Sequence, residues 1–133
     1  MGHVHKDDEA LAAMAAGDPT EPVVMLNMLK YRDIAAAGHG VDGLSGRDAY
    51  EAYGREFAKL GPRFGGTPVW MGRALHTIIG EEDWDVVILV RYPTRRQFIE
   101  MVSDPDYVAI APMRAAALAD SRLVELQQLM PRS

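Results

Sequence analysis

The pattern of apolar and polar positions along the chain predicts four strands. They are expected at residues 22–29, 67–79, 84–92 and 122–130, because each segment is rich in large apolar residues and ends near Gly, Pro or acidic residues. In the first and third segments apolar side chains occupy both parities, which is typical of strands covered on both faces. The acidic residues 81–83 predict a short turn and therefore an antiparallel hairpin between the second and third strands.

Helices are expected in the gaps between these strands. A capping box beginning at Ser45 opens the first, whose inner face carries an apolar stripe at spacings of three and four: Tyr50, Tyr53, Phe57 and Leu60. A second capping box begins at Thr94. Beyond it, Pro105 restarts the helix as its first residue, and Pro112 is expected to kink or restart it again.

The order strand, helix, strand, strand, helix, strand is that of the split βαβ arrangement. It predicts the α+β class with a ferredoxin-like βαββαβ fold, in which a four-stranded antiparallel sheet carries its helices on one face. The 133 residues fit one such domain, expected at residues 22–133. Residues 8–16 favour a short helix, so residues 1–21 are expected to form an N-terminal helical extension outside the core.

The two main helices can cover only one face of this sheet, although the first and third strands are apolar on both. An exposed apolar face of that size needs a partner. The sequence therefore predicts a homodimer formed through the sheet face.

Residues 33–46 contain four glycines and little periodicity, which predicts a mobile loop. The segment from Gly38 to Gly43 matches the G-x-G-x-x-G pattern of nucleotide-binding loops. Its context does not fit, because such a site needs a strand running directly into the glycines and an acid about 20 residues further on. Arg63 occupies that position, so a flexible loop is the better interpretation.

The composition excludes several kinds of chemistry. The chain has no cysteine, which excludes disulfides, thiolate metal sites and a cysteine nucleophile. Its net charge of −5 without a basic stripe argues against nucleic-acid binding. No apolar segment approaches the about 20 residues of a membrane helix, and the N-terminus lacks a signal-peptide pattern. We therefore expect a cytoplasmic protein that uses no cofactor and no metal.

Several motifs occur together between Pro22 and Met130, at residues 25–33, 65–72, 91–98, 104–107 and 120–123, with Arg114 among them. As a set they resemble a widespread bacterial family of domains of unknown function within the dimeric α/β-barrel superfamily. The resemblance implies a ferredoxin-like fold and a dimer. It implies no single chemistry, because relatives in the superfamily include cofactor-independent monooxygenases, isomerases, haem-dependent peroxidases and plain binding proteins. Many relatives carry a histidine before this arginine, where the chain has Met113.

Polar residues within the apolar strands are candidate site residues. Asn27 interrupts the first strand, where its amide either ties strand to helix or faces a ligand cavity. His76 shares the parity of Trp70 on the second strand, so it is either a general base beside an aromatic platform or an ordinary strand residue. Arg91 lies among apolar neighbours and needs an anion, from the protein or from a ligand.

Further candidates lie on the first long helix and before the glycine-rich loop. Tyr53 lies on the inner face of the helix, where core packing is the alternative to ligand binding. Tyr31 and Arg32 lie at the mouth of the loop, where they can orient an acidic small molecule.

Two functions are consistent with these residues. The first is a cofactor-independent enzyme, monooxygenase- or isomerase-like, acting on a small aromatic or acidic metabolite between sheet and helices. In that case His76 and Asn27 would be catalytic, and the substrate would be bound by Tyr31, Arg32, Tyr53, Trp70 and Arg91. The second is a non-catalytic ligand-binding or accessory homodimer that uses the same cavity, which the scarcity of paired acid–base residues favours.

Overall fold

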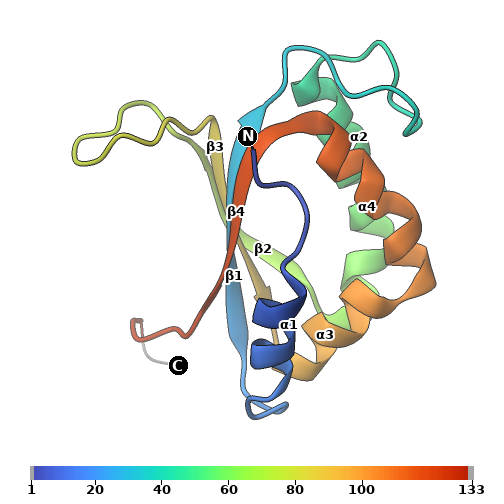
Figure 1. The fold of residues 1–133 in the computed structure, drawn as a ribbon. Helices are drawn as coiled ribbons and strands as arrows, with labels where there is room; N and C mark the ends of the chain where they lie inside the picture. Colours follow the sequence, from blue (N-terminus) through green and yellow to red (C-terminus); the bar gives the residue numbers. More distant parts are fainter. Residues whose placement is uncertain (1, 132–133) are drawn as a thin grey trace.

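The computed structural model describes residues 2–131, and shows a four-stranded antiparallel sheet with its helices on one face (Figure 1). The elements are α1 (Asp8–Ala15), β1 (Val23–Tyr31), α2 (Gly46–Leu60), η1 (Gly61–Phe64, a 3-10 helix), β2 (Thr67–Arg73), β3 (Val86–Tyr92), α3 (Arg95–Ser103), α4 (Pro105–Ala117) and β4 (Leu118–Leu126). The strand order is β2-β3-β1-β4. The predicted ferredoxin-like fold is thereby confirmed. Residues 1, 132 and 133 of the predicted domain ranges lie outside the described residues.

The main helices begin where the sequence predicted. The Ser45 hydroxyl accepts from the Asp48 N–H (3.0 Å), and the Thr94 hydroxyl accepts from the Gln97 N–H (3.2 Å). Each bond satisfies a backbone donor that the helix start leaves unpaired. Pro112 does not divide α4, contrary to expectation, because packing along α2 supports the whole helix. Within residues 2–131, no helix is both long enough and apolar enough to cross a membrane.

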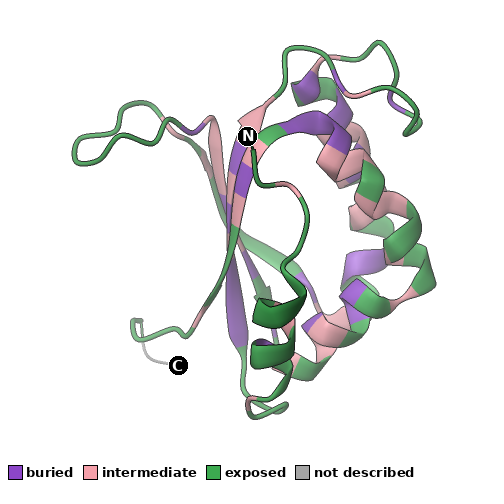
Figure 2. Ribbon diagram, in the orientation of Figure 1, coloured by how far each residue is buried: buried purple, intermediate pink, exposed green. Residues whose placement is uncertain are grey.

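The side chains of the strands alternate between two faces of the sheet. One face packs against the helices and contributes Val23, Met25, Leu29, Ile88 and Val90 to the core. The other face, here termed the open face, carries Val24, Leu26, Met28, Lys30, Trp70, Val87, Leu89, Arg91, Arg122 and Val124. No helix of the described chain lies over the open face, and buried residues concentrate on the helical side (Figures 1 and 2).

The N-terminal extension packs against the core instead of lying outside it. Met14 of α1 is buried in the same apolar cluster as β1 and α3. Before α1, the chain runs beside β4, where the His3 N–H donates to Asp120 Oδ1 (2.8 Å) and the Ser121 hydroxyl donates to the His3 carbonyl (2.6 Å). This packing places α1 beside α3, where it covers apolar surface of the core.

Several strand boundaries differ from those predicted, including the end of β4 at Leu126 instead of residue 130. β2 ends at Arg73 instead of residue 79, and β3 begins at Val86. Residues 74–85, here termed the arm, therefore form a long loop instead of a tight hairpin turn, and project on the side of the open face (Figure 1). β4 begins at Leu118 instead of residue 122, since its first residues pair with the end of β1. Strand pairing outweighs the helix preference of the alanine-rich sequence there.

The glycine-rich loop is anchored, so the prediction of a mobile loop is not supported. Val41 is 2% exposed. The Ala35 N–H donates to the Leu44 carbonyl and the Ala36 N–H to the Ala116 carbonyl of α4, both at 2.9 Å. The buried Val41 lies between the glycines, whereas the hydrogen bonds are made by backbone groups of Ala35 and Ala36, which precede them.

Gly46, the first residue of α2, lies where backbone segments meet closely. A Cβ atom there would lie 2.2 Å from the Arg32 carbonyl oxygen and 2.6 Å from that of Ala117. Gly46→Ala should therefore lower the free energy of unfolding by about 1–3 kcal/mol, as measured by urea denaturation.

Gly54→Ala, in the middle of the same helix, is the matched control. A Cβ atom at Gly54 meets nothing within 4 Å, so this change should raise the stability by about 0.5–1 kcal/mol. Equal effects of the two substitutions would contradict the close approach at Gly46.

Candidate functional site

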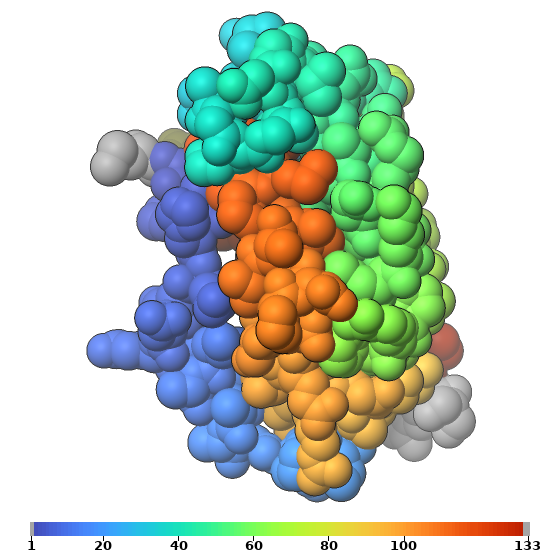
Figure 3. Space-filling view, turned by 90° about the vertical axis from the view of Figure 1, so that its right-hand side faces the viewer, coloured from blue at the N-terminus to red at the C-terminus, as the bar shows by residue number. Residues whose placement is uncertain are grey.

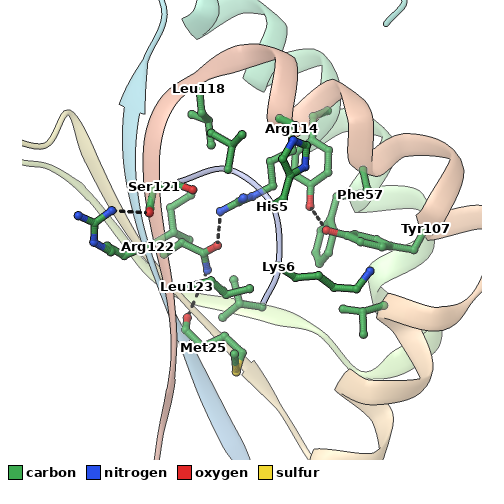
Figure 4. Close-up of a pocket in the computed structure, with 18 of the residues that line it drawn as sticks. His5, Lys6, Met25, Phe57, Tyr107, Arg114, Leu118, Ser121, Arg122 and Leu123 are labelled. Carbon is green, nitrogen blue, oxygen red and sulfur yellow. Dashed lines mark hydrogen bonds between the residues drawn. The ribbon is translucent and has the colours of Figure 1, made fainter. Parts of the chain in front are cut away.

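A cavity of about 1850 Å³ lies between the sheet and the helices. The sheet contributes Met25, Asn27 and Ile88, and the helices contribute Tyr50, Tyr53, Phe57, Tyr107 and Arg114. Figure 3 shows the outer side of this helical layer, where α4 lies between α2 and the N-terminal segment. His5 and Lys6 of that segment also line the cavity (Figure 4). A mostly apolar lining with a few polar groups is typical of small-molecule sites.

Arg114 enters the cavity from α4 and meets Asn27 on β1. Its Nη2 donates to Asn27 Oδ1 (3.3 Å), and Asn27 Nδ2 donates to the Met25 carbonyl (3.4 Å) (Figure 4). Asn27 is 9% exposed, and both polar ends of its amide thus have partners. The two alternatives for this amide, structural tie and cavity residue, both describe its position.

The Arg114 guanidinium has no carboxylate partner. All ion pairs of residues 2–131 use other basic side chains. A guanidinium has five N–H donors in one plane. The bond to Asn27 uses one of them and the Tyr50 hydroxyl lies close enough to interact with another, so the remaining donors are available to an anion in the cavity.

Aromatic side chains form one wall of the cavity beside Arg114. The ring centroids of Tyr50 and Tyr53 are 5.3 Å apart, and those of Tyr53 and Tyr107 are 6.5 Å apart. Phe57 continues the wall at 6.1 Å from Tyr53. The hydroxyls of Tyr53 and Tyr107 are 3.0 Å apart (Figure 4). Because one of them donates to the other, the accepting hydroxyl keeps its own proton for a ligand.

Burial favours the protonated form of Tyr53 and Tyr50. It raises the pKa of Tyr53 well above the ordinary value, and the neighbouring hydroxyls of Tyr107 and Tyr50 add to the rise. Burial also raises the pKa of Tyr50, although the positive charge of Arg114 opposes that rise. At neutral pH, Tyr53 and Tyr50 are therefore hydrogen-bond donors and not bases.

The structure brings some of the predicted site residues to this cavity. Asn27 and Tyr53 line its interior, and Arg32 lies at its edge. Tyr31 reaches the aromatic wall from β1, with its ring centroid 6.1 Å from that of Tyr50.

His76, Trp70 and Arg91 do not line the cavity, and the prediction that they share it is wrong. Trp70 lies on the open face, opposite Leu89. Arg91 lies on the same face, opposite Val24. His76 lies on the exposed arm, beyond the end of β2. A bulge between Pro68 and Trp70 and the early end of β2 remove the simple alternation that linked His76 to Trp70. Arg91 shares the parity of Val87 and Leu89, as predicted, but this parity belongs to the open face.

A protein-family model matches most of this sequence. The model of a domain of unknown function, DUF1330, matches residues 43–127. The chain belongs to the DUF1330 family. No curated protein matches this DUF1330 chain.

Solved structures resemble this DUF1330 domain over most of its length. RPA0582, a protein of unknown function from Rhodopseudomonas palustris, is 38% identical with a TM-score of 0.90, covering 98% of this chain and 100% of that one. A dimeric protein of unknown function with a ferredoxin-like fold from Bacteroides fragilis is 12% identical (TM-score 0.54, covering 80% and 96%). A dimeric ferredoxin-like protein of unknown function from Thermobifida fusca is 15% identical (TM-score 0.53, covering 85% and 96%). The latter two show the fold alone.

The site contains two residues that sequence reasoning did not assign to it. Arg114 and Tyr107 are seven residues apart on α4, which places them on the same face of the helix. A cation on a helix otherwise rich in alanine was a usable signal in this DUF1330 domain. The contacts of Arg114 with Asn27 and of Tyr107 with Tyr53 could not be predicted from the sequence, because they depend on how α4 packs against β1 and α2.

The raised pKa of Tyr53 predicts how stability changes at high pH. The folded state favours the protonated phenol, so its contribution is complete below the unfolded pKa of about 10 and is lost as the pH rises above it. Tyr53→Phe removes the titrating group. Between pH 10 and 11 the variant should therefore lose less stability than the wild type, as measured by urea denaturation at each pH.

The difference in stability between the two proteins at pH 7–8 serves as the baseline for this comparison. Parallel stability curves from pH 8 to pH 11 would show that Tyr53 titrates as an ordinary exposed phenol.

Proposed function

We propose that this DUF1330 domain binds a small carboxylic acid with an aromatic or other apolar body in the cavity between sheet and helices. The observation that carries the proposal is Arg114, a cation in a mostly apolar cavity without an ion pair among the described residues. A charge in such surroundings is stabilised by a counter-ion. The planar guanidinium matches the two oxygens of a carboxylate.

The neighbours of Arg114 define the rest of the proposed ligand. Asn27 holds one side of the guanidinium and so acts as a positioning residue. The rings of Tyr50 and Tyr53 offer a surface for an aromatic or aliphatic body. The hydroxyl pair of Tyr53 and Tyr107 can donate to a second polar group of the ligand.

A cofactor-independent, isomerase-like enzyme acting on the same class of acid is the second candidate. The specific observation in its favour is the protonated phenol of Tyr53, which shares a hydrogen bond with Tyr107 inside the cavity. Such a donor stabilises negative charge that develops on a substrate oxygen, as in an enolate. Recovery of a bound acid unchanged supports binding alone, whereas turnover that Tyr53→Phe abolishes supports the enzyme.

We also propose that the domain forms a homodimer through the open face. Trp70 and Val124 are 55% and 43% exposed on this face, and neighbouring positions are apolar. An uncovered apolar sheet face is stabilised by a second apolar surface. The dimeric proteins of similar fold from Bacteroides fragilis and Thermobifida fusca support this proposal.

Binding of benzoate tests the proposed site. Wild-type protein should bind benzoate measurably in isothermal titration calorimetry, and bind the uncharged analogue benzamide more weakly. Arg114→Met should weaken benzoate binding about 10- to 100-fold, because it removes charge-assisted hydrogen bonds. Arg55→Met, which removes an exposed cation of α2 outside the cavity, should leave the affinity unchanged. Equal affinity for benzoate and benzamide would contradict a role for Arg114.

The oligomeric state tests the second part of the proposal. The wild type should sediment as a dimer at micromolar concentration, and Trp70→Glu should shift it towards monomer because a carboxylate would be buried in the apolar interface. Val108→Glu is the matched control, since Val108 is 53% exposed on α4, away from the open face. A wild type that remains monomeric would disprove the dimer.

A further inference from the structure

The arm, residues 74–85, carries three strongly exposed apolar side chains. Leu75, Ile78 and Ile79 are 73%, 87% and 94% exposed. The arm leaves one end of the sheet and projects to the side of the open face, away from the helices (Figure 1). Apolar side chains presented together in this way mark an interaction surface.

The base of the arm is tied firmly to the sheet. Arg122 of β4 forms an ion pair with Glu82 (2.9 Å) and covers the ring of Trp84 at 5.0 Å, and Trp84 is only 8% exposed. Lys30 of β1 pairs with Asp83 (3.0 Å). The projecting position of the arm is therefore built into the fold, which lowers the entropy lost when a partner covers its tip.

The basic residues of the open face differ in one respect. Lys30 and Arg122 are paired with acidic residues of their own chain. Arg91 is exposed and has no ion pair within residues 2–131. It lies near the end of β3 that is farthest from the arm, opposite Val24 and Thr67.

The acidic residues of the arm show the complementary difference. Glu82 and Asp83 are paired within the chain, whereas Glu81, which is exposed on the arm, has no ion pair within residues 2–131. The open face therefore has an unpaired cation near one end and an unpaired carboxylate on the arm at the other end. A twofold axis that exchanges the two ends makes such a face complementary to itself.

We propose that the arm docks on a second copy of this chain, so that Glu81 of each copy pairs with Arg91 of the other. The inference rests on the proposed homodimer and adds its orientation. About six residues of extended chain span roughly 20 Å, which is the farthest that the arm can reach from its base. Packed sheets lie only about 10 Å apart. An arm of this length reaches the facing end of the second copy, where its apolar tip is covered.

Charge reversal tests this pairing. Glu81→Arg and Arg91→Glu should each raise the dimer dissociation constant at least tenfold in a dilution series followed by sedimentation velocity, because like charges would face each other. The double variant carrying both changes should return to within about threefold of the wild type, since the pair is restored with opposite polarity. Circular dichroism confirms that each variant is folded.

Glu100→Arg and Arg96→Glu are matched controls. Both residues are exposed on α3, on the helical side of the sheet, and their reversal changes the net charge by the same amounts. They should leave the dissociation constant unchanged. Single reversals at Glu81 and Arg91 that behave like these controls, or a double variant no tighter than the singles, would overturn the proposed pairing.

The absence of cysteine from the chain allows an independent measurement. The double variant Glu81→Cys/Arg91→Cys should be cross-linked into a covalent dimer by a bismaleimide of about 10 Å reach, because an ion pair of two long side chains holds its Cα atoms beyond the about 7 Å limit of a direct disulfide. Neither single variant should be cross-linked. A monomeric wild type would disprove both the homodimer and the arm contact. A dimeric wild type without rescue and without the cross-link would disprove the arm contact alone. Benzoate binding at Arg114 is measured separately from both.

Discussion

The helices of this chain cover one face of its sheet and leave the other face bare, and most other features depend on this arrangement. Strands β1 and β3 carry apolar residues on both faces. Only one set, which includes Val23, Met25 and Leu29, packs against the helices. The opposite side chains of the same strands lie on the open face. The two faces of the sheet therefore differ. The face under the helices encloses a cavity, and the open face leaves apolar side chains uncovered, as a protein interface does before its partner binds.

On the covered side, charge and burial are combined unusually. Six basic side chains within residues 2–131 form an ion pair with a carboxylate, as Arg95 does with Glu125 at 2.7 Å. Arg114 instead points into the cavity and is held there by an amide oxygen. An amide orients a guanidinium without neutralising it, so the positive charge remains available. Burial raises the pKa of the adjacent Tyr50 and Tyr53, so both remain protonated donors at neutral pH, which favours the proposed acid over a cation.

On the uncovered side, the arm extends the apolar surface beyond the sheet. Its root is fixed by Arg122 and Trp84, so its exposed tip is a structural feature of the fold and not a frayed end. Both surfaces use strands β1 and β3, because residues on one strand alternate between the cavity and the open face. The proposed ligand cavity and the proposed dimer surface therefore lie on opposite faces of the same two strands.

The sequence by itself determined the order of elements, the helix starts at Ser45 and Thr94, and the two-sided apolar character of β1, because these are local properties of capping and periodicity. It also singled out Asn27 and Tyr53, which interrupt apolar patterns with polar atoms. Only the tertiary structure decided that His76 lies on an arm and Trp70 on the open face, since a bulge and an early strand end change which face a residue occupies. The meeting of Arg114 with Asn27 was also decided there: 87 positions separate them in the sequence, and only the packing of α4 over β1 brings them together.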